Sequence, residues 1–365
     1  MKILLFSNSV KGIISFRIEF LQTLVNKGDN VIALLPNDPR TKVIRNVGVD
    51  VIDTPIDRRG INPITDIKLW LSYISSIKSI QPDVVLTYTI KPNIYGGIAC
   101  RLTKTPYLSN ITGLGTAIEE GGLVGRLALR LYKEALKNAH CVFFQNQSNR
   151  QNFIKDGITA KKTRLIPGSG VNLQKHPYEE YPINNGKIIF LFIGRVMKAK
   201  GIDEFLEAAQ TIRRSNPHVE FHILGDCKGD YSAILEDMES KGIIRYHGVQ
   251  SAVHSFIKHA HATIQPSYHE GMSNVLLETA ACGRPVLATN VPGCKETFDE
   301  GVSGLGFEAK NAESLIDTIS KFIELPYEQK RQMGIAGRRK MEREFDRQIV
   351  IDSYMGEINQ IQESK

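Results

Sequence analysis

Several sequence features that would assign the chain to a particular class of protein are absent from its 365 residues. No apolar run approaches the 18 or more residues that a transmembrane helix requires. The N-terminal apolar segment turns polar at Ser7, too early for the apolar region of a signal peptide. The five cysteines are scattered and form no C-x-x-C pair, which is typical of reduced thiols. We therefore expect a cytoplasmic protein without a membrane-spanning segment.

Two ligand-binding motifs are also missing. There is no D-x-D sequence, so a metal ion held by paired aspartates is not predicted. No G-x-G-x-x-G pattern follows the first apolar segment, which argues against a dinucleotide-binding oxidoreductase. We accordingly predict neither a metal ion nor a cofactor.

Positive charge is concentrated in the first half of the chain. Residues 1–180 contain 24 Lys and Arg against 14 Asp and Glu, whereas the remainder contains 22 against 25. A basic half indicates an anionic partner. Zinc-finger spacing, a helix-turn-helix signature and an aromatic-basic RNA motif are absent, so nucleic acid is not expected and an anionic membrane surface is favoured. Basic residues that only keep the protein in solution are an equally good explanation.

Short apolar runs alternate with helical patterns along most of the chain. The alternation runs from Lys2–Phe6 through a long helical stretch at Pro63–Ile80 to Cys141–Gln145, and restarts at Lys187–Ile193. Such βαβ alternation predicts parallel sheets with helices on both faces. We predict an α/β protein with two doubly wound, Rossmann-like domains facing each other across a cleft.

A stretch rich in Pro, Gly and Asn, residues 167–186, separates the two halves and predicts an interdomain link. We place the N-terminal domain at residues 1–175 and the C-terminal domain at residues 176–345. Helical residues 346–362 follow. Ligands of such sheets bind at the carboxyl ends of the strands.

Two glutamates carry the strongest functional signal. Glu270 falls in a loop after an apolar run, and Glu278 lies about two turns into the next helix. The free N–H groups and positive dipole end of that helix suit a phosphate, and ionised carboxylates accept hydrogen bonds from hydroxyls. Phosphate flanked by hydroxyls describes a sugar nucleotide. The residues that open the helix are the candidate phosphate ligands: Gly271, Met272, Ser273, Asn274 and Val275.

A plainer interpretation of these glutamates stays open. Glu270 would then only end a loop, and Glu278 would lie at the solvated edge of its mostly apolar helix.

A second cluster of residues favours the functional interpretation of the two glutamates. Gly194, Arg195 and Lys200 follow the apolar run Lys187–Ile193, at the sheet edge also expected for Glu270. Arg offers a fork of donors and Lys a point charge, so both would hold a diphosphate and neutralise its charge as it leaves.

The pattern Gly194-Arg195-x4-Lys200-Gly201 with Glu270-x7-Glu278 resembles the donor-binding domain of family 4 retaining glycosyltransferases of the GT-B fold. The resemblance covers essentially the whole chain and is most specific over residues 194–300. It implies that Glu270 contacts the donor sugar and that Glu278 holds the ribose. It also implies that Arg195 and Lys200 bind the diphosphate.

The resemblance has further implications. Gly248 and Val249 would lie near the base of the nucleotide, and the helix at 346–362 would cross back onto the first domain. Transfer would retain the anomeric configuration through front-face attack, with cationic side chains in place of a metal.

The N-terminal half narrows the resemblance. Segments Tyr88–Gly97 and Asn110–Thr116 are similar to members that extend oligosaccharides on undecaprenyl diphosphate. Many members have a His in the N-domain loop where this chain has Lys91, so Lys91 is a candidate donor or acceptor contact, or else an ordinary loop residue. The loop with Lys11 and Gly12 faces the donor or the acceptor in the family.

These resemblances imply a transferase acting on an undecaprenyl-diphosphate-linked saccharide in bacterial capsule, O-antigen or glycan synthesis. It would be peripheral on the inner face of the plasma membrane. The favoured donor is a UDP-N-acetylhexosamine, and GDP-linked sugars and UDP-hexoses remain open, as does the oligomeric state. The alternatives are a sugar-nucleotide epimerase of the same architecture, which needs no acceptor, and a non-catalytic sugar-nucleotide-binding protein.

Overall fold

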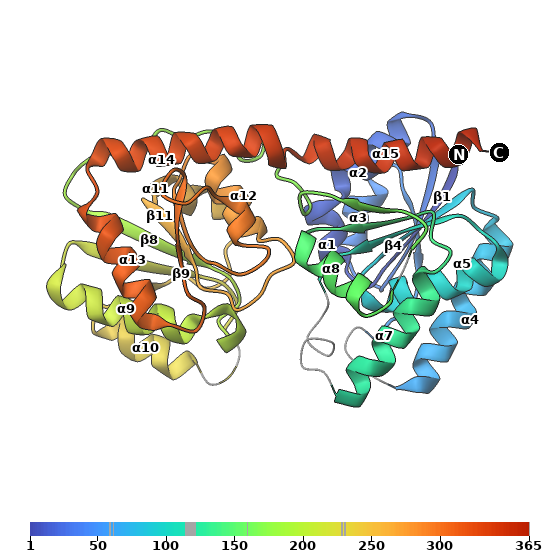
Figure 1. Ribbon diagram of the computed structural model, residues 1–365, viewed down its shortest axis with the longest axis horizontal. Helices are drawn as coiled ribbons and strands as arrows, with labels where there is room; N and C mark the ends of the chain where they lie inside the picture. The colour runs from blue at the N-terminus through green and yellow to red at the C-terminus, as the bar shows by residue number, and fades with distance from the viewer. Residues whose placement is uncertain are drawn as a thin grey trace. The chain divides into compact units, whose positions relative to one another are not determined.

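The computed structural model in Figure 1 describes residues 1–57, 60, 62–113, 122–158, 160–227, 229 and 231–364. The chain divides into two compact units. Unit 1 comprises Met1–Ser169 and Gln348–Lys365, and unit 2 comprises Gly170–Arg347. Along the chain, the boundary between the units therefore lies between residues 169 and 170, slightly before the predicted boundary between residues 175 and 176. The C-terminal segment from residue 348 belongs to unit 1.

Unit 1 is built on a seven-stranded sheet in which every pairing is parallel, in the order β3-β2-β1-β4-β5-β6-β7. Most of its central strands are buried along their whole length, which explains their continuous apolar sequences. The strands are β1 Lys2–Ser7, β2 Asn30–Leu35, β3 Asp50–Asp53, β4 Val84–Tyr88, β5 Tyr107–Ile111, β6 Cys141–Phe144 and β7 Thr163–Leu165.

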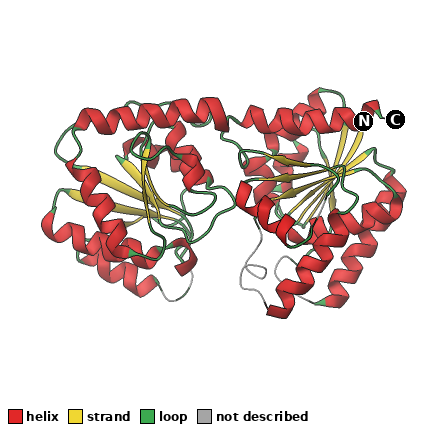
Figure 2. Ribbon diagram, in the orientation of Figure 1, coloured by secondary structure: helices red, strands yellow, loops and turns green. Residues whose placement is uncertain are grey.

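Helices cover both faces of this sheet (Figure 2). The longest one within the unit, α4, begins at Pro63, whose missing N–H suits a first helical position, and the side chain of Asn62 caps it by accepting a hydrogen bond from Ile64 N. The helices are α1 Val10–Phe16, α2 Ile18–Asn26, α3 Thr41–Arg45, α4 Pro63–Ile80, η1 Pro92–Gly96, α5 Gly97–Thr103, α7 Gly122–Leu136, α8 Gln147–Lys155 and α15 Arg347–Glu363.

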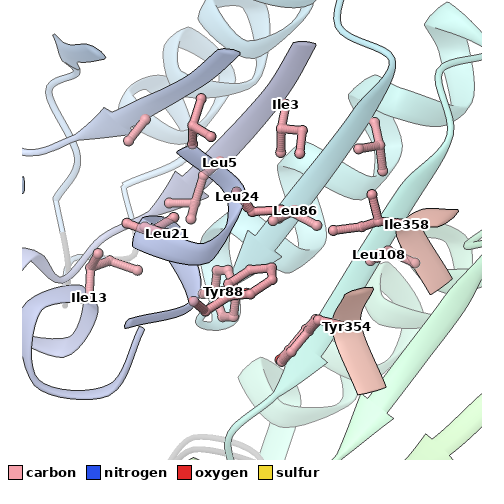
Figure 3. Close-up of a cluster of buried hydrophobic side chains, with 14 of the residues drawn as sticks. Ile3, Leu5, Ile13, Leu21, Leu24, Leu86, Tyr88, Leu108, Tyr354 and Ile358 are labelled. Carbon is pink, nitrogen blue, oxygen red and sulfur yellow. The ribbon is translucent and has the colours of Figure 1, made fainter. Parts of the chain in front are cut away.

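Helix α15 is part of the unit 1 core. Figure 3 shows Tyr354 and Ile358 of this helix beside Leu86 and Leu108 of the sheet, and all four side chains are buried. The ring of Tyr354 lies 4.3 Å from that of Phe143 between centroids. Each fully buried side chain of this size stabilises the fold by roughly 1.5–3 kcal/mol relative to leaving it exposed. The C-terminal helix therefore completes the N-terminal unit.

Unit 2 repeats the architecture with a six-stranded parallel sheet in the order β10-β9-β8-β11-β12-β13. The predicted α/β class with two doubly wound, Rossmann-like domains is confirmed. The strands are β8 Ile188–Ile193, β9 Val219–Leu224, β10 Arg245–Tyr246, β11 Ala262–Gln265, β12 Val286–Thr289 and β13 Gly304–Phe307.

The helices of unit 2 pack around this second sheet (Figure 2). They are η2 Lys198–Lys200, α9 Ile202–Ser215, α10 Ser232–Ser240, α11 Val253–His259, α12 Asn274–Ala281, η3 Lys295–Thr297, α13 Ala312–Glu324, α14 Tyr327–Lys340 and η4 Met341–Phe345. In the described part of the chain, no helix has both the length and the hydropathy needed to span a bilayer.

Each sheet contains a point at which the order of its strands reverses. In unit 1 the chain moves outward from β1 through β2 to β3, then returns to pair β4 with the other side of β1. In unit 2 the reversal lies between β8 and β11, which are hydrogen-bonded neighbours. Open α/β sheets bind ligands beyond the carboxyl ends of the strands at such points. The loops after β1, β4, β8 and β11 are therefore the places to look for function.

Candidate active site

The loops that follow β8 and β11 bring two predicted site residues into contact. Lys200 Nζ forms an ion pair with Glu270 Oε1, and the two side chains are 21% and 16% exposed. The same carboxylate oxygen accepts a hydrogen bond from Ser267 Oγ at 2.9 Å. The prediction that both charges lie at one edge of the sheet is confirmed. A cation and a carboxylate, each half-buried and held in place, face the switch point of unit 2.

Close backbone packing fixes the position of this pair. Gly201 has a φ of +70°, and a Cβ on it would lie only 2.0 Å from the carbonyl oxygen of Pro266. Tyr268 N donates a hydrogen bond to Ala199 O at 3.1 Å. The loop that carries Lys200 therefore rests directly on the loop that carries Glu270, and only glycine fits where they meet.

Arg195 lies in the same loop as Lys200 but differs from it in its surroundings. Its side chain is exposed, and no ion pair or hydrogen bond of its guanidinium is found within the described ranges. Its neighbours are fixed, because Gly194 N donates to Leu224 O and Val196 N donates to Asp226 O, both at 2.9 Å. Arg195 is thus an available cation on an anchored backbone.

The N-terminus of α12 supplies hydrogen-bond donors next to Glu270. Ser273 caps the helix, its own N–H being used by Gly293 O at 2.8 Å. The backbone N–H groups of Asn274 and Val275 have no acceptor among the described residues, and Asn274 Oδ1 is buried without a partner there. Unsatisfied N–H groups at the positive end of a helix dipole favour an anionic group such as phosphate.

The turn around Gly293 closes one side of this site. A Cβ on Gly293, whose φ is +84°, would lie 2.5 Å from Glu270 O. Met272 is 7% exposed and packs in a hydrophobic cluster with Leu277. The backbone from Glu270 through Ser273 is therefore held between this turn and the interior of the unit.

Glu278 lies one and a half turns into α12, and the structure resolves its position as half-buried, at 26% exposure. Burial raises the pKa of its carboxyl to about 7, and the charge of Arg347 opposes this shift. Its Oε1 lies 3.9 Å from Nε2 of His176. Burial also lowers the pKa of His176 to about 4, so near neutral pH this imidazole carries no charge to stabilise the Glu278 carboxylate.

Gly248 and Val249 follow β10 and lie beside the loop after β9. Gly225 N donates to Gly248 O at 2.8 Å, and the side chain of Val249 is 69% exposed. Gly248 adopts a positive φ of 62°. These two residues form an exposed turn at the carboxyl end of the sheet, the same edge as Arg195 and Lys200.

The predicted residues of unit 1 also lie at its switch point, after β1 and β4. Lys91 is 12% exposed and forms an ion pair with Asp66 at 2.6 Å, and Tyr95 also donates to Asp66. Lys11 is exposed in α1, and Gly12 N donates to Ser9 Oγ, which caps that helix. Residues 114–116 of the predicted segment Asn110–Thr116 lie outside the described residues.

Sequence reasoning missed three residues that shape these sites. Ser267 orients Glu270, Asp66 holds Lys91, and His176 approaches Glu278. The contact of Ser267 could have been predicted from the sequence, because this residue lies three positions before Glu270 in the same turn. Asp66 and His176 come from segments remote in sequence, and no local pattern points to them.

Two family models match the chain in succession. The model described as "Glycosyl transferase 4-like" matches residues 2–146, and the one described as "Glycosyl transferases group 1" matches residues 177–340. Together they cover most of both units. The chain belongs to the family 4 glycosyltransferases. It is therefore an enzyme of the glycosyltransferase class with the GT-B type of fold.

Individual relatives agree with this assignment. The chain is 26% identical to N,N'-diacetylbacillosaminyl-diphospho-undecaprenol alpha-1,3-N-acetylgalactosaminyltransferase of Campylobacter jejuni, over 97% of each chain. It is 26% identical to UDP-Gal:alpha-D-GlcNAc-diphosphoundecaprenol alpha-1,3-galactosyltransferase of Escherichia coli, over 72% of this chain and 71% of the relative. The crystal structure of Anabaena HepE in complex with UDP and glucose has a TM-score of 0.77 at 17% identity, with 99% of each chain covered.

Proposed function

We propose that this glycosyltransferase moves an N-acetylhexosamine from its UDP conjugate onto a saccharide carried by undecaprenyl diphosphate. The observation that carries the proposal is the placement of Lys200, Glu270 and the N-terminus of α12 at one switch point. The choice of substrates is supported by the relatives from C. jejuni and E. coli, whose names specify diphospho-undecaprenol-linked acceptors.

In this proposal the donor lies along the carboxyl edge of the unit 2 sheet. Arg195, Lys200 and the N–H groups of Asn274 and Val275 bind the two phosphates. Glu270 accepts hydrogen bonds from hydroxyls of the sugar. Because Lys200 and Glu270 pair with each other and lie on anchored loops, the donor meets two charges that are oriented in advance, and little reorganisation remains for the transition state.

The remaining donor contacts follow the same edge. Glu278 accepts hydrogen bonds from the ribose hydroxyls when its carboxyl is ionised. The exposed turn at Gly248 and Val249 lies against the uracil. Neither contact involves a metal ion, and the cationic side chains take over the neutralising role that a metal has in other transferases.

The chemical step exchanges one bond to the anomeric carbon for another. The bond to the UDP phosphate oxygen breaks as the acceptor hydroxyl attacks from the same face, which retains the configuration. The departing phosphate oxygen accepts the proton of that hydroxyl. Arg195, Lys200 and the dipole of α12 stabilise the negative charge that develops on the leaving group.

Unit 1 binds the acceptor and the membrane in this proposal. Lys91, Lys11 and Gly12 line its switch-point loops. Helix α7 displays exposed basic residues at helical spacing together with exposed Val124 and Leu127, a composition that suits the inner face of a plasma membrane with anionic lipids. The basic residues of the helix are Arg126, Arg130 and Lys133, and Lys137 follows it directly. The enzyme would act there in bacterial capsule, O-antigen or protein-linked glycan synthesis.

The decisive experiment offers radiolabelled UDP- and GDP-sugars with undecaprenyl-diphosphate-linked mono- and disaccharides. We expect labelled lipid product from a UDP-N-acetylhexosamine and none from the Glu270→Ala variant. A changed sugar nucleotide formed without acceptor would identify an epimerase instead. Donor binding without any product would indicate a non-catalytic sugar-nucleotide-binding protein. If product formed only with a UDP-hexose or only with a GDP-sugar, that sugar nucleotide would be the donor in place of the UDP-N-acetylhexosamine.

A further inference from the structure

Three side chains with metal-ligand chemistry meet near the C-terminal end of α12, whereas the phosphates of the proposed donor bind at its N-terminus. His176 lies in the segment before β8, His254 is on α11, and Cys282 ends α12. One ligand atom from each lies within 4.8 Å of the others. Cys282 is fully buried, and the two histidine side chains are 19% and 30% exposed. The cluster therefore has a buried thiol and a route to solvent.

The spacing of these atoms is close to that of a tetrahedral metal site. Cys282 Sγ lies 3.4 Å from His254 Nδ1. Zn–S bonds of about 2.3 Å and Zn–N bonds of about 2.0–2.1 Å at a tetrahedral angle separate sulfur and nitrogen by about 3.5 Å. That pair already has the separation that zinc needs. The third ligand atom has to approach by roughly 1 Å, which rotation of an imidazole side chain provides.

Carboxylates accompany both imidazoles. Nε2 of His254 is 2.9 Å from Glu179 Oε1, and Lys258 holds the other oxygen of Glu179 at 3.0 Å. This carboxylate favours a proton on Nε2 and leaves the Nδ1 lone pair directed at Cys282. Imidazole ligands of metals usually donate their second nitrogen in this way, which fixes the tautomer and raises ligand basicity.

His176 shows the same division between its two nitrogens. Its Nε2 lies on the side of Glu278, at 3.9 Å from Oε1. Its Nδ1 is buried and has no hydrogen-bond partner in the described part of the chain. A buried polar atom without a hydrogen-bond partner is uncommon in proteins, because it either binds a ligand or destabilises the fold. A metal bound at Nδ1 supplies that partner.

We propose that His176, His254 and Cys282 bind a zinc ion, with water in the fourth position. On binding, the Cys282 thiol releases its proton to solvent as the Zn–S bond forms, and both imidazoles contribute lone pairs. One thiolate with two imidazoles selects zinc over magnesium or calcium, which prefer oxygen ligands. The ion lies at the C-terminal end of α12 and not at the N-terminus that faces the phosphates, and it ties the segment before β8 to α11 and α12. The proposal does not depend on the proposed function.

The test begins with the metal-free full-length protein, titrated with Co²⁺ as a spectroscopic probe. We expect one Co²⁺ per chain, tetrahedral visible bands, a thiolate-to-cobalt charge-transfer band, and displacement of the cobalt by Zn²⁺. Cys282→Ala should abolish the charge-transfer band, and Glu179→Gln should weaken binding by about 10- to 100-fold. Cys294→Ala is the matched control, because Cys294 is an equally buried cysteine of the same unit and should keep the band.

Four results would overturn the proposal. Wild-type protein that binds no stoichiometric Co²⁺, or binds it without the charge-transfer band, shows that the cluster is only a thiol–imidazole hydrogen bond. A band that survives Cys282→Ala, or that disappears in Cys294→Ala, places the metal elsewhere. The wild-type titration is decisive even if a variant fails to fold, and circular dichroism of each variant identifies that case.

Discussion

At the scale of single residues, the central observation is that Lys200 and Glu270 form an ion pair with each other. The sequence predicts that both residues lie at the same sheet edge, because each follows a buried strand. It does not predict their contact, since that depends on Gly201 allowing the two loops to touch. The same limit applies to Glu278, whose half-burial is decided by packing and not by helical periodicity.

Lys200→Ala tests the leaving-group contact. Loss of one oriented charge that stabilises the transition state should lower kcat by roughly 10²-fold or more. Lys198→Ala is the control, because Lys198 is an exposed lysine of the same short helix η2, and its turnover should stay near that of the parent. Steady-state kinetics with saturating donor measure both. A Lys200→Ala variant changed only in acceptor affinity would remove this residue from the mechanism.

Glu270→Ala tests the sugar contact and the pairing together. The variant should lose nearly all transfer, because a contact to the reacting sugar is gone and Lys200 loses its orientation. The double variant with Lys200→Ala should then be far less impaired than the product of the two single effects, since residues that act as a unit are not additive. Activity of Glu270→Ala within a few-fold of the parent, or strict additivity in the cycle, would refute this role.

Glu278 predicts a pH dependence of donor binding in metal-free protein. Burial raises the pKa of this carboxyl to about 7 against the opposing charge of Arg347, so the carboxyl is ionised only as the pH rises through that value. UDP affinity should therefore increase by about tenfold between about pH 6 and pH 8. Glu278→Gln should show a flatter profile, and it also corrects for the ionisation of UDP itself. Isothermal titration calorimetry gives both profiles, and parallel ones would contradict the assignment.

The same raised pKa predicts how stability changes with pH. An acid that holds its proton more tightly when folded contributes stability below its unfolded pKa of 4.5, and this contribution is lost as the pH rises through about 7. Glu278→Gln should therefore be more stable than the parent at about pH 8 by up to about 3 kcal/mol, and the difference should shrink at about pH 5. Denaturant unfolding at both values measures it. A variant that is less stable at the higher pH would contradict the burial argument.

At the scale of elements, the apolar strands and amphipathic helices follow from local sequence, and the exceptions have physical reasons. Helix α2 begins only at Ile18, because the chain breaks at Arg17 after the separate short helix α1. Strand β13 contains Gly304 and Gly306, which have low β propensity. Helix α8 is too polar for an apolar stripe to mark it, and β7 has only three residues, so neither has a local signal.

Glu357 on α15 is an element-scale contact that no local pattern predicts. Its carboxylate is fully buried and lies 3.1, 2.7 and 2.5 Å from nitrogens of His140, Lys162 and Arg164, respectively. Glu357→Gln removes the charge at constant shape and should lower the free energy of unfolding of unit 1 by about 1–3 kcal/mol. Glu363→Gln, an exposed glutamate of the same helix, should change it by less than about 0.5 kcal/mol. Equal effects of the two in denaturant unfolding would show that the ion pairs contribute nothing.

At the scale of the whole molecule, the two units share one architecture but differ in net charge. Each presents loops from its central strands at a switch point, but the excess of basic residues is confined to the N-terminal half. The doubly wound architecture could be predicted from the βαβ alternation.

The division of the chain into units could be predicted less well from local sequence. Residues after 347 return to unit 1 and complete its core through Tyr354 and Ile358, and local sequence patterns do not indicate such a long-range contact.

The charge asymmetry predicts that unit 1 carries the affinity for anionic membranes. Each basic residue near such a surface contributes about 1 kcal/mol, so neutralising Arg126, Arg130 and Lys133 on α7 should weaken vesicle binding by roughly 10²-fold. The matched control neutralises three exposed basic residues of unit 2, namely Lys187, Lys241 and Arg245, and gives the same net charge.

Cosedimentation with phosphatidylserine vesicles at rising salt separates the two explanations of the basic half. If α7 forms the contact surface, only the unit 1 variant loses binding, and wild-type binding falls as salt screens the charges. If the basic residues serve only solubility, wild-type protein binds neutral and anionic vesicles alike. Equal losses in both triple variants would mean that net charge, and not the position of the charges on α7, determines association.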